Sequence, residues 1–259
     1  MSAVTGPVGG IGAEAGGPLK PPAQPTYLPQ DRGDRLNPGR LHPRYQVLTR
    51  LRDALARTID SELLPPGDAV LDYGCGSRPY TPLFARKFRR YVGADFPGND
   101  VAEITIGPRG DLPVEDASFD CLVSTQVLEH VADPRAYLRE AHRVLKPGGS
   151  LVLSTHGIWH YHPDPEDYWR WTIDGLQVEI CRAGFDIFWL QNVFGLASCA
   201  VQLWQDATAE SVPGWLRPAY VWLLQSLIGR IERRHSVHLS HDASVYVVLA
   251  RKGIQALSH

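Results

Sequence analysis

A glycine-rich turn after a short apolar run contains the first residues that could hold a small charged ligand. The run at residues 69–73 includes Asp72, and Gly74 and Gly76 follow it. Glycines at these positions let a ligand approach the main chain with no Cβ in the way. A carboxylate two residues before the first glycine repels a phosphate but suits an ammonium or sulfonium group. The turn therefore favours a ligand with a cationic amino-acid part.

A second carboxylate, Asp95, ends the next apolar run, Val-Gly-Ala-Asp. An acid at this place in a nucleotide-binding sheet accepts hydrogen bonds from a ribose diol. A dinucleotide fingerprint needs a third glycine three residues after the second, but Pro79 stands there, and the sequence has no Gly-Lys-Ser/Thr phosphate loop. Asp72 and the missing glycine together favour an adenosyl cofactor over a nicotinamide one.

The stretch 155–172 is rich in histidine and aromatic residues, and two functions are open for it. Its aromatic rings could line a pocket for a second substrate, with His156 or His160 as a base, or they could pack the loop onto the domain. His130, further back in the chain, is a third candidate base. The spacing of His156, His160 and His162 does not match helical ligand pairs, and prolines interrupt the stretch, so we expect no metal site.

Apolar runs alternate with helical patterns along most of the chain. Strands are expected at 69–73, 90–94, 101–106, 119–124, 150–154, 185–193 and 245–250. Helical periodicity at 43–59, 80–88, 134–145 and 172–183 separates several of them. This alternation predicts an α/β fold with a doubly wound, mostly parallel seven-stranded sheet and a helical insertion before the last strand.

We expect five segments along the chain. They are a flexible Gly/Pro-rich tail (1–40), a helix covering the cofactor face (41–66), a catalytic core (67–195), a helical insertion or lid (196–240), and a closing strand with a C-terminal tail (241–259). In the helical part near 216–234, apolar residues at helical spacing are followed by Arg230, Arg233 and Arg234. A lid, an interface and a contact with a membrane surface are all open for it.

Five motifs occur in order at a familiar spacing. They are V-L-D-Y-G-C-G (70–76), G-A-D (93–95), D-L-P-V-E-D-A-S-F-D (111–120), V-L-E-H-V (127–131) and R-V-L-K-P-G-G-S-L-V-L-S-T (143–155). Together they resemble the class I S-adenosylmethionine-dependent methyltransferases, in particular the small-molecule group with a type 11-like domain. The resemblance covers about residues 67–190 and implies a Rossmann-like fold with S-adenosylmethionine as the cofactor.

The resemblance also implies a set of cofactor-binding residues. Carried over by position, they are Asp72, Gly74, Cys75, Gly76, Asp95, Phe96, Asp111, Leu112 and Gln126. Asp72 and the two glycines would face the methionine part, Asp95 the ribose, and the Asp111–Leu112 pair the adenine. Gln126 would reach the cofactor through its backbone. The family often has a third glycine where this chain has Arg78, whose side chain could approach the methionine carboxylate.

The expected function is methyl transfer to a small-molecule acceptor, at oxygen or nitrogen, with a lipid-linked or glycan precursor among the candidates. A non-catalytic cofactor-binding or regulatory module and a nicotinamide-dependent reductase are the alternatives. The formal net charge of −2 argues against nucleic acid as a partner. Four widely spaced cysteines and the lack of a visible signal peptide or membrane span predict a cytoplasmic enzyme, and its oligomeric state is open.

Overall fold

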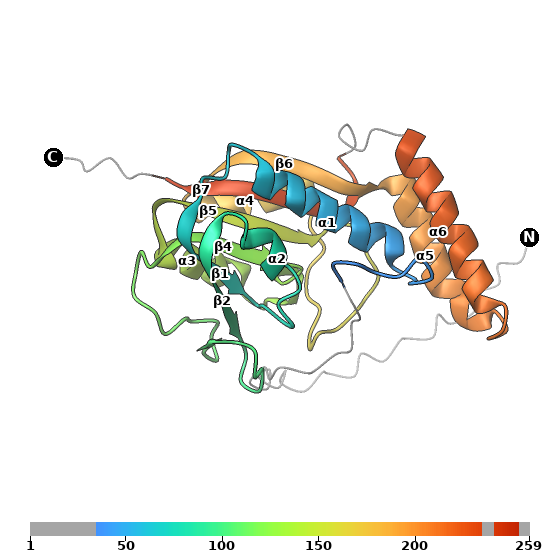
Figure 1. Ribbon diagram of the computed structural model, residues 1–259, viewed down its shortest axis with the longest axis horizontal. Helices are drawn as coiled ribbons and strands as arrows, with labels where there is room; N and C mark the ends of the chain where they lie inside the picture. Colours follow the sequence, from blue (N-terminus) through green and yellow to red (C-terminus); the bar gives the residue numbers. More distant parts are fainter. Residues whose placement is uncertain (1–34, 235–240, 254–259) are drawn as a thin grey trace, which may run out of the picture.

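The computed structural model describes residues 35–234 and 241–253, which form a seven-stranded sheet with helices on both faces (Figure 1). The strands are β1 (Gly67–Tyr73), β2 (Phe88–Asp95), β3 (Ile104–Thr105), β4 (Phe119–Thr125), β5 (Leu145–His156), β6 (Phe185–Gly195) and β7 (Ala243–Lys252). The helices are α1 (Tyr45–Asp60), α2 (Thr81–Phe84), η1 (Leu128–His130), α3 (Pro134–Val144), α4 (Ile173–Arg182), α5 (Leu196–Thr208), η2 (Ala209–Ser211) and α6 (Arg217–Arg234).

The strand order is β3-β2-β1-β4-β5-β7-β6, and β7 runs antiparallel to the other six strands. This arrangement confirms the expected doubly wound, mostly parallel sheet. The chain order changes direction between β1 and β4, so the ends of these two strands flank the place where such sheets bind ligands.

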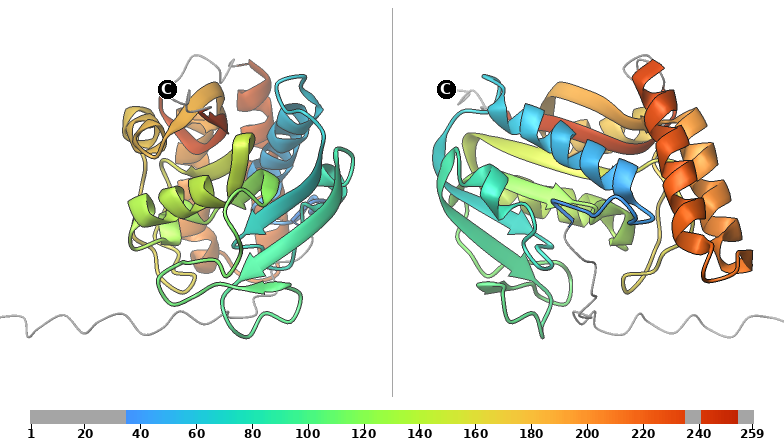
Figure 2. Two further views of the ribbon diagram at one scale, coloured as in Figure 1. Left: turned by 90° about the vertical axis from the view of Figure 1, so that its left-hand side faces the viewer. Right: turned by 45° about the vertical axis from the view of Figure 1, so that its right-hand side comes forward.

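Adjacent residues of the central strands pack into two separate cores. On β1, Leu71 packs with the α3 and α4 side of the sheet, and Val70 packs with the α1 side. Two views confirm that α1 and α3 lie on opposite faces (Figure 2). Burial on both faces explains why these strands are continuously apolar rather than alternating.

The helical pair α5 and α6 lies against the N-terminal end of α1 (Figure 1). The side-chain amides of Gln202, Gln205 and Gln225 all donate to the backbone oxygen of Pro43, at 3.1, 2.8 and 2.8 Å. Gln225 also bonds both other glutamines at 2.9 Å. Because the three side chains are buried, this network fixes the start of α1.

Some elements differ from the sequence expectation. The helix expected at 80–88 is one turn, because Phe88 already begins β2 and packs beside Phe84 in the core. The third strand has two residues instead of the six expected. Most of the expected N-terminal tail, residues 1–34, lies outside the described residues, as do 235–240 and 254–259. Among the described helices, none has the length and apolar character needed to cross a bilayer.

Candidate active site

The turn after β1 has the backbone that its glycines predict. Gly74 has φ +86° and Gly76 has φ +52°, in the left-handed region that favours glycine. A Cβ at Gly74 would lie 2.7 Å from Val127 Cγ2, whereas a Cβ at Gly76 would meet nothing within 4 Å. The first glycine is therefore required by packing, and the second leaves open space above the turn for a ligand.

Arg78 occupies the place of the family's third glycine and itself adopts φ +58°. Its guanidinium donates to Glu103 Oε1 at 2.5 Å and to the backbone oxygen of Tyr91 at 2.7 Å. These bonds hold the arginine against β2, so the structure does not support the expectation that it approaches the methionine carboxylate.

Asp72 is buried at the end of β1. Its carboxylate accepts a hydrogen bond from the Tyr91 hydroxyl, and burial raises the pKa of Asp72 to about 7. Desolvation penalises the charged form, and a neighbouring cation would restore it. This carboxylate therefore suits the ammonium group that the sequence motif predicts as its partner.

The pKa of Asp72 gives a pH-dependent prediction. A cationic ligand binds the ionised carboxylate, so affinity for S-adenosylmethionine should be highest above pH 7 and fall below it, by up to about tenfold per pH unit. Calorimetric titrations between pH 7.5 and 5.5 would measure this change, and Asp72→Asn should flatten it. Equal slopes for the wild type and the variant would mean that Asp72 does not contact the ammonium group.

Asp95 is buried at the end of β2, beside the glycine turn. Its Oδ2 accepts from the Gly76 amide and from Asn99 Nδ2, both at 2.8 Å, and its Oδ1 accepts from the Phe96 amide at 2.8 Å. The three donors fix both oxygens of the carboxylate. Oδ2 already accepts two hydrogen bonds, so Oδ1, which accepts one, is the oxygen with a lone pair left for a ligand. Phe96 is half-buried next to the core.

The other predicted cofactor residues lie around this centre. Cys75 is buried, and burial raises the pKa of its thiol, so it stays protonated and is a poor nucleophile. Asp111 is exposed and Leu112 is a core residue, with its amide donating to Glu140 Oε1 at 2.7 Å. The Leu112 N–H is therefore already bonded, so Leu112 would contact adenine through its side chain.

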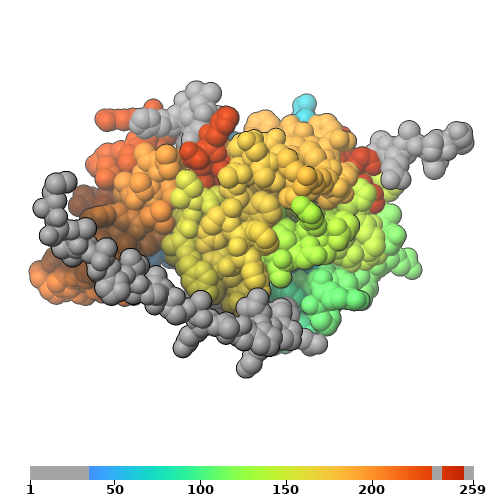
Figure 3. Space-filling model, turned by 180° about the vertical axis from the view of Figure 1, so that it is seen from behind, coloured from blue at the N-terminus to red at the C-terminus, as the bar shows by residue number. Residues whose placement is uncertain are grey.

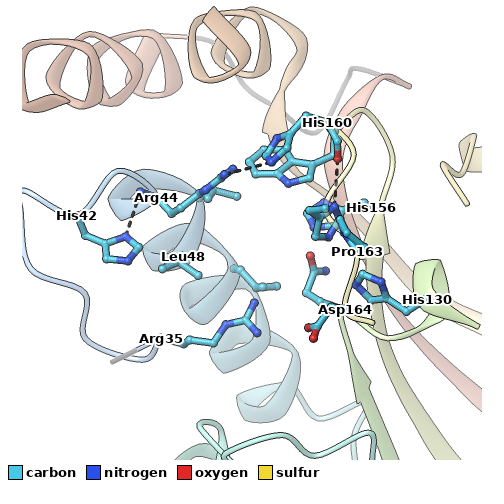
Figure 4. A pocket seen from close by; sticks show the side chains of 14 residues that line it. Arg35, His42, Arg44, Leu48, His130, His156, His160, Pro163 and Asp164 are labelled. Atoms are coloured by element: carbon cyan, nitrogen blue, oxygen red, sulfur yellow. Dashed lines mark hydrogen bonds between the residues drawn. The ribbon is translucent and has the colours of Figure 1, made fainter. Parts of the chain in front are cut away.

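A cavity of about 490 Å³ lies between α1 and the segment after β5. Its lining residues are Arg35, His42, Arg44, Val47, Leu48, Leu51, Gln126, His130, His156, Trp159, His160, His162, Pro163 and Asp164. Figure 4 shows Arg35, His42, Arg44 and Leu48 on one side, facing His130, His156 and Asp164 on the other. Seen from behind, α4 and the segment that follows β5 (both yellow) cover the middle of the molecule, beside the helical pair α5 and α6 (orange; Figure 3).

Gln126 and the three candidate bases meet in this cavity. Gln126 has φ +58° and its Nε2 donates to Ser154 Oγ at 3.1 Å. A left-handed backbone is uncommon for a residue other than glycine and occurs often at functional sites. Of the predicted cofactor residues, Gln126 lines the cavity, whereas Asp72 and Asp95 are not among its lining residues.

His156 ends β5 and is buried against a tryptophan. Its ring stacks on Trp159 with centroids 4.9 Å apart, and its Nδ1 lies 3.2 Å from the backbone oxygen of Ser244. That carbonyl can only accept, so Nδ1 carries the proton and Nε2 has the lone pair. Burial lowers the pKa of His156 well below its usual 6.5, which makes the ring neutral at pH 7.

The two other candidate histidines are held by different partners. His160 Nε2 accepts from Arg44 Nη2 at 3.2 Å, and its Nδ1 lies 3.5 Å from Asp206 Oδ2. Arg44 also bonds Asp206 at 3.1 Å, so α5 fixes this wall of the cavity. His130 Nδ1 lies 2.5 Å from the backbone oxygen of Glu166.

Comparison with known proteins agrees with this arrangement. A family model described as a methyltransferase domain matches residues 43–188, more than half of the chain. The chain belongs to the S-adenosylmethionine-dependent methyltransferases. The matched residues run from the start of α1 into β6 and include both carboxylates of the glycine turn region and all three candidate bases.

Relatives of this methyltransferase share part of its length. A 37.1 kDa protein in transposon TN4556 of Streptomyces fradiae is 35% identical over 46% of this chain and 36% of its own. A ubiquinone biosynthesis O-methyltransferase of Cereibacter sphaeroides is 33% identical over 45% of this chain and 56% of its own. A demethylmenaquinone methyltransferase of Clavibacter sepedonicus is 28% identical over 64% of this chain and 71% of its own.

A solved structure shares the fold. The [4+2]-cyclase SpnF superposes with a TM-score of 0.54 at 21% identity, over 81% of this chain and 82% of its own. At this identity the similarity concerns the fold alone.

The residues of the methyltransferase fit its cofactor, S-adenosylmethionine. The space above Gly76 accepts a ligand close to the main chain, and Asp72 and Asp95 offer carboxylates for a cation and a diol.

The sequence did not indicate the partners of two residues in the site, Glu129 and Arg44. Glu129 is completely buried, and its Oε2 accepts from Thr155 Oγ1 at 2.8 Å. It belongs to the V-L-E-H-V motif, which indicated its importance but not its partners. Nothing in the sequence pairs Arg44 with Asp206, which stand 162 residues apart.

Proposed function

We propose that this methyltransferase transfers a methyl group from S-adenosylmethionine to an oxygen or nitrogen atom of a small molecule bound in the cavity. The position of Gln126 carries the proposal. It lines the cavity directly after β4, which pairs with β1, and β1 runs through Asp72 into the glycine turn. The cavity thus opens at the same sheet edge as the predicted cofactor residues.

The walls of the cavity favour an acceptor with an apolar body and polar groups at its ends, since Arg35, His42 and Arg44 also line it. Val47, Leu48 and Leu51 line it from α1, while His130 and His156 line it from the sheet side. A ring with a hydroxyl or amine group suits these walls, and the two quinone-pathway relatives support a ring of that type. A lipid-linked or glycan precursor stays among the candidates.

The mechanism that we propose requires little from the protein beyond positioning. When bound, S-adenosylmethionine supplies a methyl group on a sulfonium, whose sulfur leaves readily as the neutral thioether of S-adenosylhomocysteine. The cavity residues hold the acceptor atom in line and exclude water. An acceptor hydroxyl must also lose a proton, and we assign that step to the lone pair on His156 Nε2, because His156 lines the cavity. The contacts of His160 with Arg44 and Asp206 favour a role in shaping the wall.

The test combines cofactor binding with turnover. We expect S-adenosylmethionine and S-adenosylhomocysteine to raise the melting temperature and nicotinamide cofactors to leave it unchanged. Incubation with pools of phenols, quinols and amines should then release S-adenosylhomocysteine and give products heavier by one methylene unit in mass spectrometry. Stabilisation by nicotinamide cofactors alone would contradict the proposal.

A cofactor-binding protein without methyl transfer is the second candidate function. The solved structure of SpnF supports this candidate, because SpnF has the same fold and is named as a [4+2]-cyclase rather than as a methyltransferase. Cofactor binding with no product from any acceptor pool, including an extract of small molecules from the source cells, would support this alternative.

A further inference from the structure

Glu129 presents a buried oxygen that the protein itself does not satisfy. Its carboxylate is fully buried, and its Oε2 is bonded by Thr155, but its Oε1 has no hydrogen-bond partner in the part of the chain that the structure describes. The Nε2 atom of His156 lies 3.7 Å from Oε1, beyond hydrogen-bond distance. An unsatisfied buried carboxylate oxygen is costly, and such groups often contact an ion.

Two histidines place ring nitrogens beside this carboxylate. Glu129, His130 and His162 each offer one donor atom, and the three atoms lie within 4.8 Å of one another. The two imidazoles meet edge to face, with ring centroids 5.0 Å apart. Donors around a tetrahedral ion at ~2.1 Å would be roughly 3.4 Å apart, so the three atoms must move closer by up to about 1.4 Å to hold one ion.

The hydrogen bonds of the histidines orient their rings as in metal sites. His130 Nδ1 lies 2.5 Å from the backbone oxygen of Glu166, and His162 Nδ1 lies 3.1 Å from that of His160. A carbonyl partner keeps the proton on Nδ1 and leaves the lone pair on Nε2. Metal-ligating histidines commonly donate their other nitrogen to a carbonyl or carboxylate in this way.

An acidic side chain supports the same tautomer of His162. Asp167 Oδ2 lies 3.4 Å from His162 Nδ1 and accepts from the His162 amide at 2.8 Å. Arg170 Nη2 approaches that ring nitrogen at 3.3 Å, but it donates to Asp167 Oδ2 at the shorter distance of 2.6 Å.

We propose that Glu129, His130 and His162 bind one divalent transition-metal ion, of the Zn²⁺, Fe²⁺ or Mn²⁺ class, at the polar wall of the cavity. Two imidazoles with one carboxylate form a donor set that these ions accept. Both histidines line the cavity, so the open side of the site faces the space where we place the acceptor. The spacing of the loop histidines did not predict this site, because two of its donors come from η1 and only one from the segment after β5.

The proposal is tested on the full-length protein without cofactor or acceptor, so its outcome is independent of methyl transfer. After treatment with a chelator and desalting, Zn²⁺, Mn²⁺ and, without oxygen, Fe²⁺ are titrated by calorimetry and by melting temperature. We expect one ion per chain for at least one metal. The variants Glu129→Gln and His162→Asn should each weaken binding by at least about 10–100-fold, the usual cost of losing a residue that only supports a ligand.

His160→Asn is the matched control, because His160 lies in the same segment and gives no donor to the cluster. It should bind the metal within about threefold of the wild type. If Glu129→Gln does not fold, His162→Asn decides alone, because His162 is only half-buried. No binding of any of the three metals at millimolar concentration, or binding unchanged in the folded variants, would overturn the proposal.

Discussion

The variant His156→Asn is expected to lower turnover by about 10²–10⁴-fold, the usual contribution of a general base. Asparagine can place its amide near the position of the imidazole Nδ1 and keep the hydrogen bond to the backbone oxygen of Ser244. It cannot replace the lone pair on Nε2. The change therefore removes the proton acceptor and retains the anchor.

Cofactor binding separates this effect from general damage to the site. His156 lines the cavity and belongs to none of the predicted cofactor motifs. We expect the dissociation constant of S-adenosylmethionine in the variant to stay within about threefold of the wild-type value. Single-turnover rates at saturating cofactor, with an acceptor that must lose a proton, measure the chemical step directly.

His42→Asn is the matched control for this experiment. His42 lines the opposite side of the same cavity, and its Nδ1 accepts from the Arg44 amide at 3.0 Å, a bond that the asparagine side-chain oxygen can also accept. Turnover in this variant should stay close to wild type. If His156→Asn keeps full turnover, the base is another group or none is needed. If it loses cofactor binding and melts earlier, His156 is structural.

The sheet and the cofactor side of the site could be predicted because local patterns determine them. Burial on both faces makes the central strands apolar, and the parallel pairing of β1 with β2 puts Tyr73 opposite Ala94. Asp72 and Asp95 then have to lie near each other at one edge. The start of α4 is local in the same way, because the Thr172 side chain caps it and its Oγ1 accepts from the Gly175 amide at 3.1 Å.

The far wall of the cavity could not be predicted, because contacts between distant segments form it. The attachment of Asp206 to Arg44 and His160 depends on how α5 packs against the start of α1. Helical periodicity predicted α5 and α6 but not which polar groups they would bury. Glutamines such as Gln225 resemble surface residues in a sequence, and only the structure shows their bonds to Pro43.

The donors around Glu129 illustrate the same limit within a recognised motif. The V-L-E-H-V sequence placed Glu129 and His130 after the fourth strand, as the structure has them. His162 joins them because the segment after β5 turns back toward η1, where the Tyr168 amide donates to the backbone oxygen of Glu129 at 2.9 Å. A search by spacing within one segment could not find that set.

Replacing Asp95 with alanine should weaken binding of S-adenosylmethionine by about 1.5–3 kcal/mol, or roughly 10- to 150-fold, the scale of lost hydrogen bonds to a charged group. The proposed contact with the ribose diol would be lost. The Gly76 amide and Asn99 Nδ2 would also lose their acceptor, which loosens the turn. Calorimetry at pH 7.5 measures the change.

Asn99→Ala separates these two contributions to the loss. It removes one donor to Asp95 Oδ2 but leaves the carboxylate and its bonds from Gly76 and Phe96 in place. A ribose contact predicts a clearly smaller loss of affinity for Asn99→Ala than for Asp95→Ala. Equal losses would mean that Asp95 acts by holding the turn, and unchanged affinity in Asp95→Ala would remove it from the cofactor site. A cofactor analogue lacking both ribose hydroxyls adds a direct check, because Asp95→Ala should then cost little further affinity if the carboxylate binds the diol.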